Sequence, residues 1–168
     1  MNKDVFNLEV TKTEKKCPVG EKTGKLNEEE GKIPVISCEG ACIRGEIARV
    51  AANMVAKEPA YRRGCHGELL AVPDSAMAKW VRRSKKVVLI DGCFMSCHGR
   101  ILEHIIDRKN LIRFDALSFY KKYTDRFGID SVSEEERLET ARLVAEMVIA
   151  ELKKEAEGRP ERSAAQCS

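Results

Sequence analysis

The sequence predicts an α/β fold: a mainly parallel sheet with helices on both faces, like Rossmann-like and flavodoxin-like sandwiches, in a single domain. Two observations support this prediction. Short apolar runs at 33–37 and 86–90 have the length and β-branched content of strands buried on both faces. Each run is followed by a segment, 43–55 or 97–106, whose apolar residues recur at helical spacing. Strands that alternate with helices imply right-handed crossovers and parallel pairing.

The region between these two units leaves two arrangements open. Pro59 ends the first helix, and a strand over 60–65 would then place Cys65 at the same sheet edge as the ends of the other strands. A strand over 68–72, cut off by Pro73, would place Cys65 at the opposite end. In both arrangements Ser75 is expected to cap a short helix before the second unit.

Beyond the second unit, 111–118 is expected to be another strand and 120–129 a charged connector. The sequence from Ser133 to Glu136 is a capping box that opens a long helix, which Gly158 ends. Six apolar positions are expected on one face of this helix: Leu138, Ala141, Val144, Met147, Val148 and Leu152.

The composition divides the chain into three parts. Residues 1–31 are polar and are expected to form an irregular arm, residues 32–158 the α/β domain with the cysteine site, and residues 159–168 a disordered tail. Cys17 in the arm and Cys167 in the tail are interpreted as ordinary thiols. A chain of 168 residues buries roughly 68–70% of its unfolded surface without help, so a metal would serve a function rather than the fold.

Charge and hydropathy exclude two classes of partner. The formal net charge is only +3 and aromatic residues make up 5%, so nucleic acid is not an expected partner. No run approaches the roughly 18 apolar residues of a membrane span, and the first residues carry charges where a signal peptide would be apolar. We therefore expect a cytoplasmic protein, in which seven cysteines point to metal binding or catalysis rather than to disulfides.

Two cysteine pairs, each with three intervening residues, follow the two apolar runs. They are Cys38 with Cys42 and Cys93 with Cys97. Ligands of parallel α/β folds bind at the carboxyl ends of the strands, where these pairs are expected. Helix N-termini stabilise thiolates there, and four thiolates suit a tetrahedral zinc ion or an iron–sulfur cluster. Alternatively, the cysteines are ordinary small hydrophobic residues of the core. That interpretation does not account well for two pairs of cysteines with the same spacing.

Several neighbours of the cysteines are weaker candidates. Cys65 joins the site only if it lies at the same edge. His66 and His98 each follow a cysteine and are assigned supporting or surface roles, because adjacent side chains normally point in different directions. Arg44 and Arg100 either offset thiolate charge or face solvent.

The motif Asp91-Gly92-Cys93 with Cys97, preceded by Cys38, resembles the DGC-domain family, whose members are held to bind zinc through cysteines. The likeness runs from about residue 33 to residue 123. It implies that Cys38, Cys93 and Cys97 are zinc ligands, joined by Cys65 if a strand precedes it. At Cys42 the chain departs from the family, which often has two residues between the first pair. The resemblance implies no defined activity.

A second resemblance concerns the first pair alone. Cys38 to Arg44 fits Cys-x5-Arg and is similar to the oxyanion loop of low-molecular-weight phosphatases and thioredoxin-coupled arsenate reductases. Cys38 would then be the nucleophile, Arg44 and loop N–H groups would hold the oxygens, and Cys93 or Cys97 could resolve a disulfide. Gly45 stands where a hydroxyl residue is expected, and no Asp-Pro-aromatic general-acid motif follows.

The sequence thus predicts a metal-binding protein with a site at Cys38, Cys42, Cys65, Cys93 and Cys97 and zinc as the expected metal, acting in metal or metalloid handling or in thiol redox chemistry. An iron–sulfur protein and a thiol enzyme stay as alternatives, and whether the chain is an enzyme is left undecided. The metal ion is the only partner indicated. The sequence does not specify a protein partner, and a homo-oligomer is compatible with it.

Overall fold

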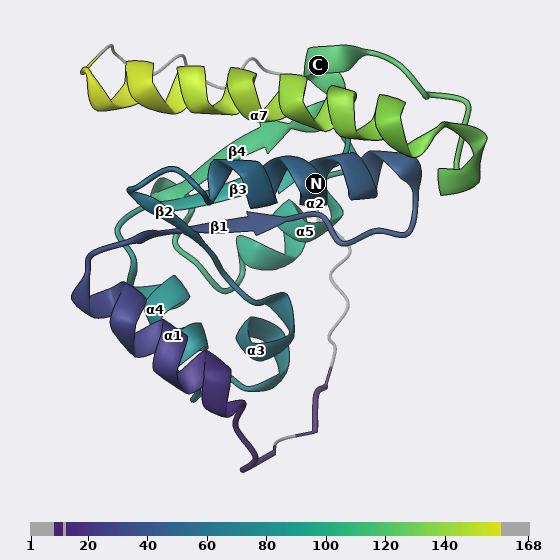
Figure 1. The fold of residues 1–168 in the computed structure, drawn as a ribbon. Coiled ribbons are helices and arrows are strands. Elements are labelled where there is room, and N and C mark those ends of the chain that lie inside the picture. Colours follow the sequence, from purple (N-terminus) through teal and green to yellow (C-terminus); the bar gives the residue numbers. More distant parts are fainter. Residues whose placement is uncertain (1–8, 12, 159–168) are drawn as a thin grey trace, which may run out of the picture.

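The computed structural model describes residues 9–11 and 13–158. In chain order its elements are α1 (Pro18–Glu29), β1 (Ile33–Ser37), α2 (Ile43–Val55), β2 (Tyr61–Arg63), α3 (His66–Ala71), α4 (Ala76–Arg83), β3 (Val87–Asp91), α5 (Cys97–Leu102), η1 (Arg108–Asn110), β4 (Leu111–Asp115), α6 (Ala116–Tyr120), η2 (Ile129–Ser131) and α7 (Glu134–Ala156) (Figure 1).

Within the described residues the strands form one parallel sheet of four strands, in the order β2-β1-β3-β4. The register places Val35 of β1 opposite Arg63 of β2 on one side and opposite Val88 of β3 on the other. The predicted α/β fold with a parallel sheet is confirmed. The chain adds β2 to one side of β1 and β3 to the other, so the strand order reverses between β1 and β3.

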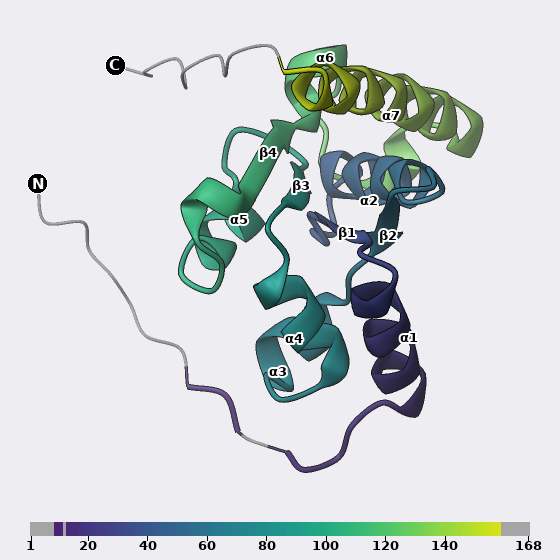
Figure 2. The same cartoon turned by 90° about the vertical axis from the view of Figure 1, so that its left-hand side faces the viewer.

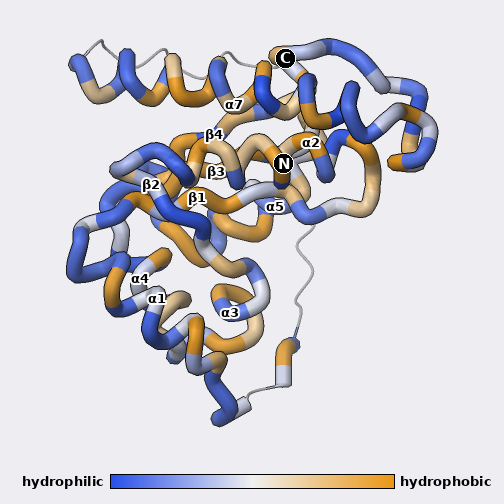
Figure 3. The backbone as a smooth tube through the Cα atoms, in the orientation of Figure 1, coloured by the Kyte–Doolittle hydropathy of each residue, from blue (hydrophilic) through white to orange (hydrophobic). Residues whose placement is uncertain are grey.

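Helices cover both faces of the sheet, and Figure 2 shows α2 and α7 on one side with α3, α4 and α5 on the other. Alternate residues of the two central strands enter two separate cores. The core beneath α2 and α7 takes Val35, Val88 and Ile90. The core beneath α3, α4 and α5 takes Ile36, Val87 and Leu89. These strands form the hydrophobic centre of the molecule in Figure 3.

The middle of the chain follows the first of the two arrangements left open by the sequence. β2 pairs with β1, and 68–72 is not a strand, because α3 occupies most of it and buries Leu69 in the core. Cys65 consequently follows a strand and lies at the carboxyl edge of the sheet. Ser75 caps α4 as expected, since its hydroxyl accepts a hydrogen bond from the N–H of Ala78 at 3.0 Å.

The N-terminal region differs from the expected irregular arm, because Pro18–Glu29 forms the helix α1. Cys17 caps it by accepting a hydrogen bond from the N–H of Gly20 at 3.4 Å, and Pro18 occupies its first turn. The helix packs against α4. The predicted tail, 159–168, lies outside the described residues.

The C-terminal part also differs in two details. The strand expected over 111–118 ends at Asp115, whose carboxylate accepts a hydrogen bond from the N–H of Leu117 at 3.0 Å and so starts α6. The capping residue Ser133 starts α7 as predicted. On α7, Leu138 and Met147 are 36% and 41% exposed, whereas Thr140 and Ala145 are buried in addition to four of the expected positions.

No helix among the described residues is both long enough and apolar enough to cross a membrane.

Candidate functional site

The loops after β1 and β3 meet at the point where the strand order reverses, which is where parallel α/β folds bind ligands. The N–H of Cys38 donates to the carbonyl of Ile90 at 2.8 Å and joins the two loops at their base. Gly92 lies so close to α2 that a Cβ there would be 2.8 Å from the carbonyl oxygen of Arg44. The loop that carries Cys93 therefore packs directly on the loop and helix that carry Cys38 and Cys42.

A glycine contact also holds the first loop against its own helix. A Cβ on Gly45 would lie 2.9 Å from the carbonyl carbon of Gly40 and 3.0 Å from its Cα, and closer still to the carbonyl oxygen. Only a residue without a side chain lets this loop fold back onto the first turn of α2. Within the loop, the Sγ of Cys38 accepts a hydrogen bond from the N–H of Gly40 at 3.4 Å.

Three of the five candidate thiols lie towards the face of the sheet that α2 and α6 cover. Cys38 packs against the core on this face. Burial raises the pKa of Tyr120, Arg44 lowers it, and the thiols of Cys42 and Cys93 are among the groups that raise it further. Both thiols therefore lie within electrostatic range of the Tyr120 hydroxyl, which is buried without a hydrogen-bond partner.

The other two candidate cysteines stand at the starts of helices that pack on the opposite face. Cys65 precedes α3 and Cys97 begins α5, and these helices pack Leu69 and Leu102 into the second core. Both thiols are exposed. The sheet edge thus carries all five candidate cysteines.

A polar network at this edge of the sheet links the three loops that carry cysteines. The guanidinium of Arg63 donates to the Ser37 hydroxyl at 2.9 Å and to the Glu39 carboxylate at 3.0 Å, and Ser37 also donates to Glu39 at 2.7 Å. Glu39 Oε1 lies 3.8 Å from His66 Nδ1. Burial lowers the pKa of His66 to about 4, helped by the neighbouring His98 and Arg63 and opposed by Glu39. His66 is therefore neutral at pH 7.

His66 and His98, assigned supporting or surface roles from the sequence, are in direct contact. Their ring centroids are 4.5 Å apart with an interplanar angle of 71°. Sequence reasoning missed this contact because each histidine was considered only beside its own cysteine. The repeated Cys-His dipeptide, at 65–66 and 97–98, was the signal that could have revealed it.

Asp91 is buried and shapes the loop after β3. Its side chain is 2% exposed, and Oδ1 accepts a hydrogen bond from the N–H of Gly99 at 3.4 Å. Oδ2 has no hydrogen-bond partner and lies 3.9 Å from the guanidinium of Arg113. Burial raises the pKa of Asp91, while the N–H of Gly99 and the charge of Arg113 oppose this shift.

We expect Asp91→Asn to gain stability relative to the unmodified chain as the pH rises. Because the pKa is raised in the folded state, the folded protein binds the proton more tightly than the unfolded chain does. That contribution is complete below the pKa of an unfolded aspartate and is lost as the pH rises through the raised value. Asparagine cannot ionise, yet it keeps an acceptor for Gly99. Urea unfolding of metal-free protein from pH 4 to 8 measures the difference.

The control for this experiment is Asp130→Asn at an exposed position, which is expected to show no such trend. A stability difference between Asp91→Asn and the unmodified chain that stays constant over this pH range would contradict the prediction.

Arg44 binds a segment outside the loop from Cys38 to Arg44, whereas the oxyanion-loop interpretation requires it to point into that loop. Its Nη1 donates to the carbonyl oxygens of Tyr123 and Thr124, at 2.9 and 3.3 Å, in the segment after α6. An arginine that holds substrate oxygens must point into the loop between the nucleophile and itself. The geometry therefore does not favour a phosphatase-like or arsenate-reductase-like centre at Cys38.

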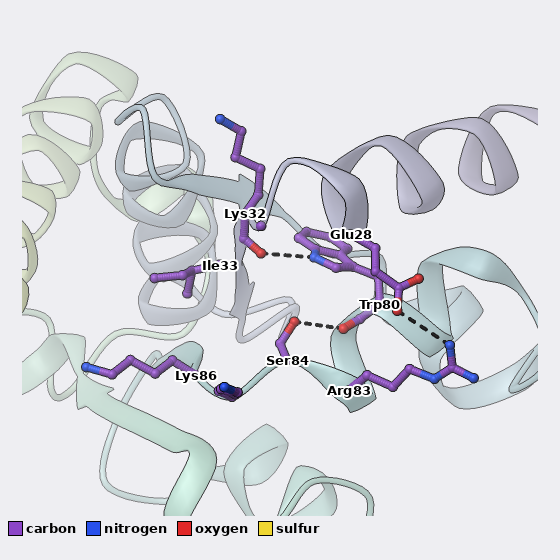
Figure 4. Close-up of a pocket in the computed structure, with 9 residues that line it drawn as sticks. Glu28, Lys32, Ile33, Trp80, Arg83, Ser84 and Lys86 are labelled. Carbon is purple, nitrogen blue, oxygen red and sulfur yellow. Dashed lines mark hydrogen bonds and ion pairs between the residues drawn. The ribbon is translucent and has the colours of Figure 1, made fainter.

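A cavity of about 400 Å³ lies at the opposite end of the sheet, where β1 and β3 begin (Figure 4). Two pairs of its lining residues interact: Trp80 Nε1 donates to the carbonyl of Lys32 at 3.0 Å, and Arg83 lies 3.5 Å from Glu28. No cysteine or histidine lines it. This cavity is separate from the cysteine site.

Among residues 9–11 and 13–158, no group of three or more histidine, cysteine, aspartate or glutamate side chains is already arranged to hold a metal ion. The backbone gathers the candidate cysteines at one edge, but their side chains do not converge on one point. Metal binding would require some of them to change rotamer, which is feasible for the exposed thiols of Cys65 and Cys97.

The fold and the site define a cysteine-rich parallel α/β domain with its thiols at the point where the strand order reverses. The family model of the DGC domain matches residues 34–142, well over half of the chain. The chain belongs to the DGC domain family, and its membership supports a cysteine-rich protein of the metal-binding class. The match extends beyond residue 123, where the sequence resemblance was expected to end, into α7. No curated protein and no solved structure matches the chain.

Proposed function

We propose that this protein binds one zinc ion through cysteine thiolates at the carboxyl edge of β1, β2 and β3, and that it acts in metal or metalloid handling or in thiol redox chemistry. The observation that carries the proposal is that Cys38, Cys65 and Cys93 each follow one of three adjacent parallel strands. Cys42 and Cys97, at the starts of α2 and α5, complete the set of candidate ligands.

One candidate thiol accepts a backbone hydrogen bond and another residue of the set stands at a helix N-terminus. The N–H of Gly40 donates to Cys38, and the N-terminus of the 13-residue helix α2 lies at Cys42. A zinc ion would supply a redox-inert centre, closed with four protein ligands or open to an exchangeable ligand with three. Which of these applies depends on how many of the five thiols take part.

Metal analysis and an absorption spectrum of protein purified without oxygen test the proposal. We expect about one zinc per chain and no visible absorption. Removing the metal with a chelator is expected to leave the circular dichroism largely unchanged, because two hydrophobic cores stabilise the fold without it.

Two results would overturn the proposal. A brown chromophore with bound iron would assign an iron–sulfur cluster instead. Metal-free protein with all thiols titratable and with arsenate or phosphate-ester turnover, abolished by Cys38→Ser, would assign a thiol enzyme.

A further inference from the structure

Two Cys-His dipeptides occupy corresponding places on the second face of the sheet. Cys65-His66 lies at the start of α3, after β2, and Cys97-His98 lies at the start of α5, after β3. The strands β2 and β3 flank β1 on its two sides. The two loops therefore approach each other above the end of β1, and the imidazole rings meet there with their centroids 4.5 Å apart.

Each of these two rings has a buried nitrogen without a hydrogen-bond partner. The two atoms are Nε2 of His66 and Nδ1 of His98. The rings are in edge contact, yet no N–H of one donates to a nitrogen of the other. Buried polar atoms are normally paired, so two unpaired nitrogens on touching rings are an exception that calls for a ligand.

The opposite nitrogen of His66 faces a carboxylate. Glu39 Oε1 lies 3.8 Å from Nδ1, and Arg63 and Ser37 hold Glu39 in this position through hydrogen bonds. Metal-binding histidines usually direct one ring nitrogen to the metal and the other to a carboxylate or carbonyl group, which fixes the tautomer. In His66 the carboxylate lies on the Nδ1 side, just beyond hydrogen-bond distance, and Nε2 is the nitrogen left for a metal.

We propose that His66, through Nε2, and His98, through Nδ1, are ligands of the metal ion, so that the centre is a mixed nitrogen–sulfur site. This inference rests on the proposed function, which requires only that a metal binds at this edge. The remaining two ligands are thiolates from among the candidate cysteines of the edge, with Cys93 of the Asp-Gly-Cys loop as one of them. Two nitrogens bound to one tetrahedral zinc ion lie about 3.3 Å apart, since each Zn–N distance is about 2.0–2.1 Å. Imidazole rings in edge contact can satisfy this separation.

Nitrogen-15 NMR of histidine-labelled, zinc-loaded full-length protein tests which ring atoms are bound. On adding zinc to the metal-free protein, we expect the metal-dependent shift at Nε2 of His66 and at Nδ1 of His98. His104 is the internal reference, because it is exposed on the segment after α5. Histidine signals that do not respond while zinc binds stoichiometrically would overturn the inference and leave the proposed function intact.

X-ray absorption at the zinc edge gives an independent count of ligand atoms. We expect two nitrogens at about 2.0–2.1 Å and two sulfurs at about 2.3 Å in the unmodified protein. A shell of sulfur alone would show that the rings only pack against each other. A protein that binds no zinc under any condition would remove both the inference and the proposed function.

The variants His66→Asn and His98→Asn should each weaken zinc binding more than tenfold, with His104→Asn as the matched control that retains full affinity. Thermal unfolding of the metal-free variants separates loss of a ligand from loss of the fold. Full zinc affinity in His66→Asn and His98→Asn would count against the inference, while the spectroscopic measurements on the unmodified protein do not depend on the variants folding.

Discussion

Replacing Cys93 with serine is expected to lower the zinc affinity about 10²–10³-fold. Structural zinc sites bind with about 10–16 kcal/mol, so an even share among four ligands is about 2.5–4 kcal/mol for each. Cys93 belongs to the Asp-Gly-Cys loop that packs on α2, and serine is close to cysteine in size, so the fold should persist. Competition with a chromogenic chelator measures the affinity.

The matched control is Cys17→Ser. The thiol of Cys17 also accepts a hydrogen bond, because it caps α1. Cys17 precedes β1 in the chain and does not follow any strand of the sheet. We expect this variant to bind zinc as the unmodified protein does, because serine is itself a good capping residue. Undiminished zinc binding by Cys93→Ser would remove the Asp-Gly-Cys loop from the site.

Gly45→Ala is expected to destabilise the protein by about 1–3 kcal/mol, the usual cost of forcing atoms into a packed space. Alanine would gain up to about 1 kcal/mol in helix propensity over glycine. That gain is outweighed here, because the new methyl group would meet the backbone of Gly40, which cannot rotate away as a side chain can. The loop that carries Cys38 would have to shift, so zinc affinity should fall together with stability.

Gly128→Ala is the control, because a Cβ at that position would meet nothing within 4 Å. Urea unfolding of the metal-free proteins gives the stability difference, and the chelator assay gives the affinity. Equal stability of Gly45→Ala and the unmodified protein would mean that the loop after β1 can leave α2 without cost.

The elements that the sequence predicted well are those with a strong hydrophobic period. β1, β3 and the helices α2 and α7 are examples, because their buried side chains recur at strand or helix spacing. β2 could not be assigned in the same way. Its residues Tyr61–Arg63 are largely polar and half-buried, and its strand character comes from pairing with β1.

The helix α1 escaped prediction for a different physical reason. Its apolar residues Val19 and Leu26 are exposed, and its buried positions are Gly20, Gly24 and Asn27. A Cβ on Gly24 would collide with the backbone of α4 at Met77. The helix docks by close approach of backbones rather than by an apolar stripe, and a hydrophobicity pattern cannot detect such a contact. Cys17-Pro18, a cap followed by a first-turn proline, was the available signal.

The site was predictable only as far as the sheet edge. Parallel pairing explains why Cys38 and Cys93 share that edge, and the placement of Cys65 depended on β2. The contact of His66 with His98 depends on the paths of two loops. The repeated Cys-His dipeptide hints at related positions, but it does not encode the distance between the rings.

The hydrogen bond from the N–H of Cys38 to the carbonyl of Ile90 also indicates whether the protein folds before or after it binds a metal. It joins residues far apart along the chain, and such non-local pairing forms slowly because a long loop must close first. Until β3 has joined β1, the cysteines of a new polypeptide are scattered along an open coil. We therefore expect a metal to be acquired only after β3 has paired with β1, by a protein that is already folded.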